Sequence, residues 1–339
     1  MFSPLITTIS ARAQIDREQG FDIVRLTNGQ VTIAIVPELG AKLLSLRLLS
    51  SEREWLWRPP GALRLFRNTL GDDFTRSTLI GADECVPTIE PCNVGGRELP
   101  DHGEAWSAAW SLESAALERG VVRTSLRLPR SPLTITRAVA LSGAAVVLDY
   151  ELVNHSSEPQ PFLWALHPLL SFEEGDRLRL APGVRTLRVE SARNPDAARG
   201  AAWTWPSPQF GVDLEHLRLA DNDGYAKFFA GPLDCGWAAL ENARTRDRLE
   251  FRWPVSEHPF LGVWLTRGGW KGFHHPAIEP TNAPCDGLAE ALKAPTPALF
   301  VPPDGARRWQ VLLDLTPIPQ SSAPPVPSSA TTAFSIRRS

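Results

Sequence analysis

The sequence predicts an all-β fold, a large antiparallel β-sandwich built as a single domain. Apolar and polar residues alternate with a period of two in short runs along much of the 339 residues, which is typical of strands with one buried face. Helical periodicity is scarce. Turn residues separate the runs at close, regular intervals, as in sandwiches and barrels. No shift of composition marks a boundary between two domains.

The first expected hairpin joins strands at 21–26 and 31–36 through Asn28-Gly29, because both residue types tolerate the positive φ angles of a tight turn. One short helix is expected at 286–292. The other expected strands are the remaining apolar or alternating runs, at 43–49, 108–112, 121–128, 133–141, 146–153, 162–166, 227–229, 236–240, 248–253, 261–266, 274–278 and 309–315.

The expected domain spans residues 20–316. Residues 1–19 are expected to form an N-terminal extension. Residues 317–339 are rich in Pro, Ser, Ala and Thr, and they are expected to be a disordered tail because they cannot bury enough apolar surface to offset their ordering entropy. The first residues lack the charged and apolar regions of a signal peptide, so a cytoplasmic location is expected.

Composition limits the class of partner. The net charge of −3 gives no basic field to attract nucleic acid or an anionic membrane, so a small and nearly neutral partner is expected. The chain has 12 Trp but only 2 Tyr; Trp stacks on sugar rings, yet it also fills sandwich cores, and most are expected in the core. None of the four Cys forms a C-x-x-C pair, so reduced thiols and no zinc site are expected.

Four segments place ionisable side chains beside glycine, proline or aromatic residues. Asp83 and Glu84 are adjacent, His102 precedes a glycine that would let a ligand approach, and His167 ends an apolar run. Glu279 stands between Ile and Pro, where a partly desolvated carboxylate needs a partner or a ligand. These residues lack the H-E-x-x-H or H-x-H spacing of metal ligands, so no metal site is predicted.

Taken in order, these motifs resemble those of the aldose 1-epimerase family, whose fold is called galactose mutarotase-like. His102 and the glycine after it are similar to the family's His-Gly pair, and His167 to its second histidine at a strand end. The Ile-Glu-Pro run around Glu279 is similar to its C-terminal apolar-Glu-Pro strand, and residues 36–46 to its opening hairpin. The resemblance covers residues 20–316.

The resemblance implies an isomerase that interconverts the α and β anomers of a hexose without a cofactor. Glu279 would be the base that removes the C1 hydroxyl proton, and His167 the acid that protonates the ring oxygen. His102 would donate to a sugar oxygen or share the acid role. The residues expected to hold the sugar are Arg67, Asp83, Glu84, Trp164 and Asp223.

Several alternatives stay open. Pro168 follows the second histidine where galactose-specific members have an aromatic-Asn pattern, so the sugar is not identified. A non-catalytic carbohydrate-binding protein could use the same fold. The Leu-Pro-Asp-His-Gly run resembles hexose-6-phosphate 1-epimerases, for which Arg64, Arg67 and Arg76 would bind the phosphate. A glycosidase or lyase would need the two adjacent carboxylates as a second acid–base pair.

Overall fold

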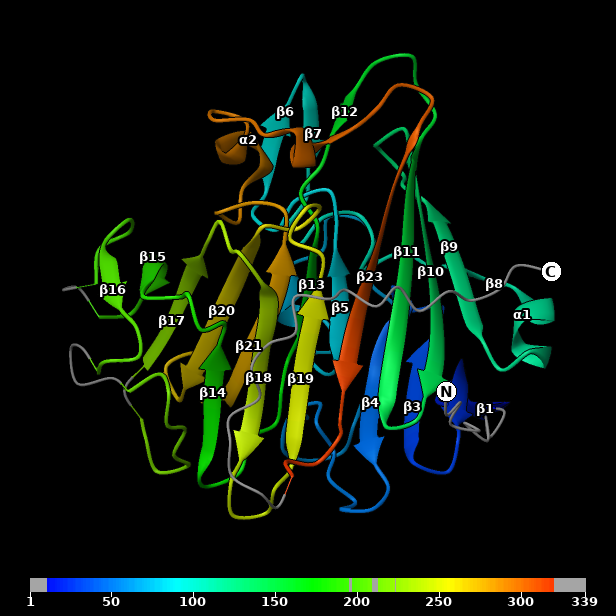
Figure 1. The fold of residues 1–339 in the computed structure, drawn as a ribbon. Helices are drawn as coiled ribbons and strands as arrows, with labels where there is room; N and C mark the ends of the chain where they lie inside the picture. The colour runs from blue at the N-terminus through cyan, green and yellow to red at the C-terminus, as the bar shows by residue number, and fades with distance from the viewer. Residues whose placement is uncertain (1–10, 195–196, 209–212, 223, 320–339) are drawn as a thin grey trace, which may run out of the picture.

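The computed structural model describes residues 11–194, 197–208, 213–222 and 224–319. Within them, an 11-stranded and an 8-stranded antiparallel sheet pack face to face, with two small two-stranded sheets beside them. Figure 1 looks onto the smaller of the two large sheets, with the larger one behind it. The expected all-β sandwich is therefore confirmed.

The strands of the larger sheet are, in spatial order, β1 (Arg12–Glu18), β2 (Phe21–Thr27), β3 (Val31–Val36), β4 (Lys42–Leu48), β5 (Ala82–Cys85), β13 (Ala165–Pro168), β21 (His274–Thr281), β20 (Phe260–Arg267), β17 (Gly224–Ala230), β15 (Thr186–Ala192) and β16 (Ala202–Thr204). Those of the smaller sheet are β14 (Asp176–Leu180), β18 (Gly236–Asn242), β19 (Arg248–Trp253), β23 (Ala306–Asp314), β11 (Ala145–Asn154), β10 (Leu133–Ser142), β9 (Val122–Arg127) and β8 (Ser111–Leu112). The remaining elements are β6 (Cys92–Val94) paired with β7 (Arg97–Leu99), β12 (Gln160–Pro161) paired with β22 (Phe300–Val301), the helices α1 (Ser114–Glu118) and α2 (Leu288–Ala291), and the 3₁₀ turns η1 (Phe74–Arg76) and η2 (Pro297–Leu299).

The hairpin predicted at Asn28-Gly29 joins β2 to β3. Gly29 takes the positive φ of 82°. Asn28 contributes through its side chain, which accepts hydrogen bonds from the backbone N–H groups of Gln30 and Val31, both at 3.0 Å. The expectation of a positive φ is therefore met at Gly29, while Asn28 is not among the residues with positive φ.

The expected N-terminal extension contains a strand. Residues 12–18 form β1, which pairs with β2 along its whole length, so the sheet begins before the expected boundary at residue 20. The strand is mostly polar and has little periodicity, because an edge strand is held mainly by backbone hydrogen bonds to its neighbour. Of the tail expected at 317–339, residues 320–339 lie outside the described residues.

The main core lies between the two large sheets. Ile278 of β21, Val263 of β20 and Phe228 of β17 belong to it and are fully buried. Because side chains alternate across a strand, the neighbours of these residues point to the opposite face of the larger sheet, here called the outer face. Glu279 and Lys227 therefore stand on the outer face.

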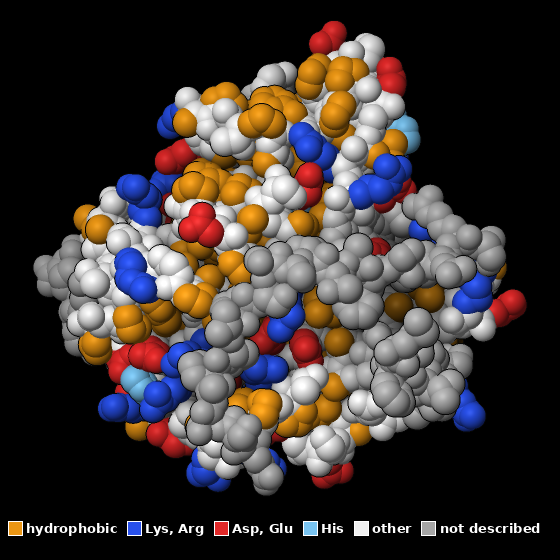
Figure 2. Space-filling model, in the orientation of Figure 1, with side chains coloured by type: hydrophobic (Ala, Val, Ile, Leu, Met, Phe, Trp, Pro, Cys, Tyr) orange, Lys and Arg blue, Asp and Glu red, His pale blue; other side chains and the backbone are white. Residues whose placement is uncertain are grey.

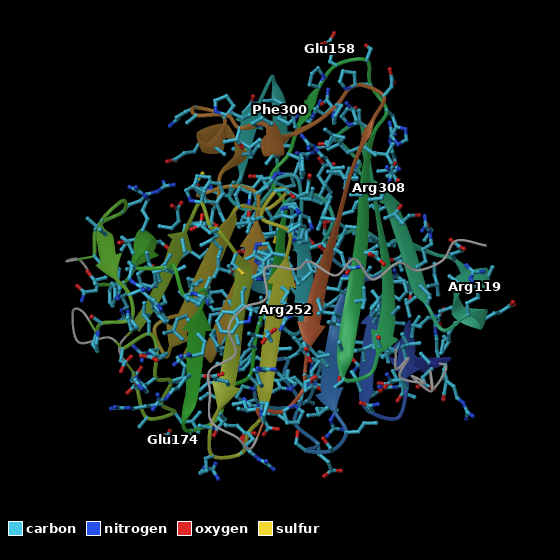
Figure 3. The ribbon with its side chains drawn as sticks, in the orientation of Figure 1. Arg119, Glu158, Glu174, Arg252, Phe300 and Arg308 are labelled. Carbon is cyan, nitrogen blue, oxygen red and sulfur yellow. The ribbon has the colours of Figure 1, made fainter. Side chains whose placement is uncertain are left out.

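The exterior mixes charge types. On the side shown in Figure 2, acidic and basic side chains are interspersed with hydrophobic ones. Arg252 of β19 and Arg308 of β23, both exposed, are labelled in Figure 3.

All four cysteines are free thiols, as expected. None of the helices in the described ranges is long and apolar enough to cross a membrane.

His258 is buried among aromatic rings of the core. Its ring lies 4.5 Å from that of Trp164 and 4.8 Å from that of Trp309 between centroids. Neither ring nitrogen has a hydrogen-bond partner among the described residues. Burial, with a smaller effect of the Arg307 charge, lowers the pKa of His258 from 6.5 to about 3. The folded protein therefore holds this imidazole neutral over a pH range in which the unfolded chain protonates it.

We expect His258→Phe to reduce the acid sensitivity of the fold. As pH falls below about 6.5, only the unfolded state gains the proton, which costs about 1.4 kcal/mol of stability per pH unit. Between about pH 7.5 and 5, the free energy of unfolding should therefore fall by about 2 kcal/mol less in the variant than in the wild type. Urea denaturation at both pH values measures this difference. The exposed His155 provides the matched control, since His155→Phe should behave as wild type. Equal losses in wild type and His258→Phe would contradict a neutral buried imidazole.

Candidate active site

Ionisable side chains form a row across the outer face of the larger sheet, here called the polar row. It runs through Lys42 of β4, Asp83 of β5, His167 of β13, Glu279 of β21 and Lys227 of β17, and each is at most 8% exposed. His167 and Asp83 are register partners on adjacent strands. The β13–β21 register, in which residue 165 faces residue 281, brings His167 beside Glu279. Strand order thus assembles residues from five strands.

The predicted base and acid lie together in this row. His167 Nε2 is 3.8 Å from Glu279 Oε1, and Glu279 is fully buried. That oxygen has no hydrogen-bond partner among the described residues. A buried carboxylate oxygen without a partner is costly, so this atom is poised to accept a hydrogen bond from a ligand.

Lys227 holds the other oxygen of Glu279. Its Nζ donates a hydrogen bond to Oε2 although the two residues lie on β17 and β21, with β20 between them. Gly262 of β20 is the register partner of Glu279, and a Cβ there would lie 3.3 Å from Oε2. The lack of a side chain at Gly262 leaves the space through which Lys227 reaches the carboxylate.

Lys227 is a charged partner. Burial alone would lower the pKa of its ammonium, but Asp286, at 3.6 Å, and Glu279 outweigh burial and raise it. The ammonium therefore compensates the buried Glu279 charge, and it is not available as a nucleophile. Lys227 and Asp286 were not predicted from the sequence. The single lysine within the apolar run 224–230 was the signal that could have indicated a buried functional cation.

His167 is neutral at neutral pH. Burial lowers its pKa well below the ordinary value, and the charges of His102, Lys227 and Lys42 lower it further. Lys42 donates a 2.5 Å hydrogen bond to Asp83 Oδ2. Burial raises the pKa of Asp83, with Lys42 opposing it, while Asp83 Oδ1 has no hydrogen-bond partner among the described residues.

His102 reaches the row from a loop. Its ring is 5.3 Å from the His167 ring between centroids, nearly perpendicular to it, and its Nδ1 lies 2.8 Å from Asp101 Oδ1. The following glycine was expected to admit a ligand. It admits the backbone of Val86 instead, because a Cβ on Gly103 would lie 2.3 Å from the Val86 carbonyl oxygen. Gly103 thus fixes the loop that presents His102.

Aromatic side chains cover this end of the row. Phe74 of η1 stacks on His102 at 3.8 Å between centroids and lies edge-on to His167 at 5.6 Å. Trp106 packs edge-on against Phe74 at 5.1 Å. These rings shield His167 and one face of the His102 ring from water, which strengthens electrostatic interactions with any bound group.

Two predicted sugar-binding residues lie on the opposite face of the larger sheet from the polar row. Glu84 follows Asp83 in β5 and therefore points into the core, where it accepts hydrogen bonds from Arg137 at 2.7 Å, Tyr150 at 2.8 Å and Trp164 Nε1 at 2.9 Å. Glu84 and Trp164 are fully buried between the sheets, so neither side chain reaches the outer face.

The predicted arginines do not join the polar row either. Arg67 is exposed and forms a 2.5 Å ion pair with Glu38, with its guanidinium over the ring of Phe21. Arg64 and Arg76 are also exposed. Asp223, predicted to grip the sugar, lies outside the described residues.

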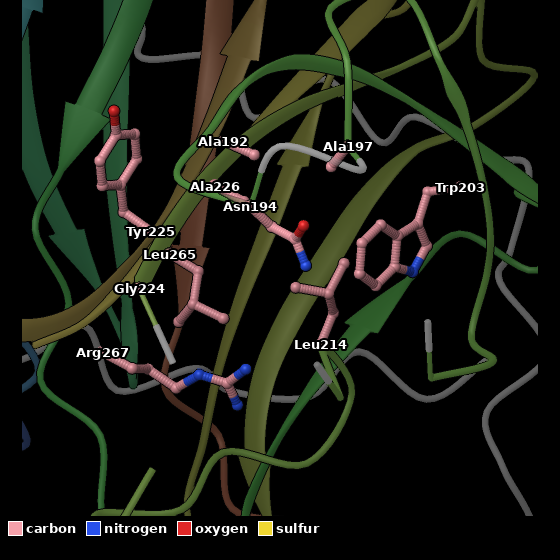
Figure 4. Close-up of a pocket in the computed structure, with 10 residues that line it drawn as sticks. All are labelled: Ala192, Asn194, Ala197, Trp203, Leu214, Gly224, Tyr225, Ala226, Leu265 and Arg267. Carbon is pink, nitrogen blue, oxygen red and sulfur yellow. The ribbon is translucent and has the colours of Figure 1, made fainter. Parts of the chain in front are cut away.

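Figure 4 shows a pocket on the core side of β15, β17 and β20. None of the described residues that line it is a predicted site residue. Within the described ranges, no group of three or more His, Cys, Asp or Glu side chains is arranged to hold a metal ion. The lining residues of the pocket are Ala192, Asn194, Ala197, Trp203, Leu214, Gly224, Tyr225, Ala226, Leu265 and Arg267.

The same architecture occurs in solved structures of several other proteins. A galactose mutarotase-like protein from Clostridium acetobutylicum matches with a TM-score of 0.69 and 14% identity over 91% of this chain and 99% of that one. One from Lactobacillus casei ATCC 334 matches with a TM-score of 0.63 and 17% identity over 87% and 100%. A galactose mutarotase related enzyme from Lactobacillus acidophilus matches with a TM-score of 0.60 and 15% identity over 90% and 97%.

No protein-family model and no curated protein sequence matches the chain. At such low identities the structural similarity establishes the fold. The resemblance inferred from three motifs is thereby confirmed at that level: the protein has the galactose mutarotase-like β-sandwich fold.

Proposed function

We propose that the protein is an aldose 1-epimerase-like isomerase, which interconverts the α and β anomers of a neutral hexose by general acid–base ring opening. The observation that carries the proposal is the pair formed by Glu279 Oε1 and His167 Nε2, 3.8 Å apart. The C1 hydroxyl and the ring oxygen of a sugar are bonded to the same carbon. A base and an acid with this separation can therefore reach both oxygens at once.

In the proposed mechanism, Glu279 takes the proton of the C1 hydroxyl while the ring oxygen receives a proton and its bond to C1 breaks. The open-chain aldehyde turns about the C1–C2 bond, and the reverse transfers close the ring on its other face. His167 is neutral at rest, so the two histidines share the acid role. His167 donates a hydrogen bond to the ring oxygen, and His102, whose Nδ1 contacts Asp101, passes the proton to that oxygen.

Two further carboxylates would hold hydroxyl groups of the sugar. Asp83 Oδ1 and Asp286 Oδ1 are buried acceptors without hydrogen-bond partners among the described residues, and they flank the central pair. A sugar offers hydroxyl donors for such acceptors. Lys42 and Lys227 are both paired with carboxylates, which favours a neutral sugar over a phosphorylated one. For the same reason, the ion pair of Arg67 with Glu38 weakens the hexose-6-phosphate alternative.

The proposal is tested by polarimetry of freshly dissolved α-glucose and α-galactose. The wild-type protein is expected to accelerate anomer exchange above the buffer rate. Glucose 6-phosphate, run in parallel, should exchange no faster than glucose. A faster reaction of the phosphorylated sugar, lost in Arg67→Ala while the glucose rate stays unchanged, would instead support a hexose-6-phosphate 1-epimerase.

A second candidate is a carbohydrate-binding protein without catalysis. The observation that favours it is the contact of Lys227 with Glu279, which occupies one carboxylate oxygen, together with the neutral state of His167. Both features weaken an acid–base pair. This candidate predicts that calorimetry detects binding of the same sugars while polarimetry detects no acceleration of their exchange.

A further inference from the structure

Two large aromatic residues on the outer face have no role in the core. Tyr225 of β17 and Trp264 of β20 are half-buried, and neither belongs to nor packs against the hydrophobic clusters of the described residues. Their rings stack at 5.4 Å between centroids and 29° between planes. Trp270, also half-buried, lies edge-on to Trp264 at 6.1 Å, and it packs against the small cluster of Phe74, Leu79 and Trp106. Tyr225, Trp264 and Trp270 are here called the aromatic strip.

The strip is continuous with the polar row. Trp264 is the register partner of Lys227 on one side and of Ala277 on the other, and Ala277 precedes Glu279 by two residues on the same face. Strand spacing and rise place the Trp264 backbone about 8 Å from that of Glu279. The positions between them, Gly262 and Ala277, have no side chain larger than a methyl group.

Tyr225 also borders the pocket of Figure 4, but its ring is not directed into it. In that view the Tyr225 ring is turned away from Trp203 and Leu214. This follows from the alternation of β17, in which Ala226 and Phe228 point into the core while Tyr225 and Lys227 point outward. The aromatic rings therefore stand on the same face as the proposed acid–base pair.

We propose that the aromatic strip binds a second sugar ring, so that the substrate is the reducing end of an oligosaccharide. This inference rests on the proposed function, which places the anomeric carbon at Glu279. A spacing of about 8 Å between backbones is the scale of one pyranose ring. Partly exposed Trp and Tyr rings offer broad apolar faces for the C–H face of a sugar, and polar edges for its hydroxyl groups. A structural role alone would place Tyr225 and Trp264 against a core cluster, as it does Trp270.

Anomer exchange of fresh maltose and cellobiose, compared with glucose, tests the inference. In Trp264→Leu, we expect kcat/KM for at least one disaccharide to fall about tenfold, the effect of losing about 1.4 kcal/mol of binding. The value of kcat/KM for glucose should stay within about twofold.

Trp237→Leu is the matched control, because Trp237 is also half-buried but packs against the main core. This variant should not change the ratio of kcat/KM for the disaccharide to kcat/KM for glucose. An unchanged ratio in Trp264→Leu would overturn the inference. If that variant does not fold, as judged by circular dichroism, Tyr225→Leu replaces it with the same expectation.

Binding measurements distinguish a failure of this inference from a failure of the proposed function. If the wild type accelerates no sugar, the epimerase proposal fails, but calorimetry with maltotriose and cellotriose still probes the strip. Binding of a trisaccharide that weakens about tenfold in Trp264→Leu and not in Trp237→Leu would preserve a second-ring site. The absence of trisaccharide binding to the wild type would reject the strip as a sugar site.

Discussion

Replacing Glu279 with Gln is expected to slow anomer exchange by about 10²–10⁴-fold, the usual contribution of a general base. The amide keeps the size of the side chain but cannot take the C1 hydroxyl proton. Lys227 loses one carboxylate partner but retains Asp286, 3.6 Å away, so the charge of the lysine stays compensated and the fold should persist. Sugar affinity should change far less than kcat, because Asp83 and Asp286 would still accept hydroxyl groups.

Polarimetry and calorimetry on the same sample measure the two effects. Glu84→Gln is the matched control, since it makes the same substitution in the same sheet on the opposite face. Its activity per folded molecule should equal that of the wild type. If Glu279→Gln accelerates the anomer exchange of glucose and galactose as much as the wild type does, the epimerase proposal is rejected and the carbohydrate-binding candidate remains.

Glu84→Gln is expected to destabilise the protein by about 3–5 kcal/mol, the cost of breaking a buried ion pair by neutralising one partner. Glu84 accepts hydrogen bonds from Arg137 and Tyr150 of the smaller sheet and from Trp164. Arg137 is 1% exposed, and without Glu84 its guanidinium retains the Ala41 carbonyl as its hydrogen-bonding acceptor. The variant therefore leaves an uncompensated charge where the two large sheets meet.

Urea denaturation near neutral pH measures this loss in the free energy of unfolding. Glu151→Gln is a suitable control, because Glu151 pairs with the exposed Arg308 on the surface, where an ion pair contributes about 0–1 kcal/mol. Similar midpoints for Glu84→Gln and Glu151→Gln would contradict a structural role of Glu84 between the sheets.

The fold class could be read from local pattern. The strands β3 and β19 have the predicted bounds. Their alternating or continuously apolar residues indicate a buried strand without any information from other parts of the chain. β5 could not be predicted, since both of its faces are buried and it carries two carboxylates among its four residues. Nor could β1, whose polar residues carry no periodic signal.

The order of three motifs in the sequence predicted His102, His167 and Glu279 as a group, and the tertiary structure places them close together. The sequence could not tell that Asp83 joins them while its neighbour Glu84 does not, because only the packing of the second sheet decides which face of β5 is the core. It could not predict Lys227 as the partner of Glu279 either. The two residues are 52 positions apart, and their contact depends on strand order and on the missing side chain at Gly262. Local pattern thus determined the strands and the candidate acid and base, whereas pairing between distant strands determined the charges that surround them.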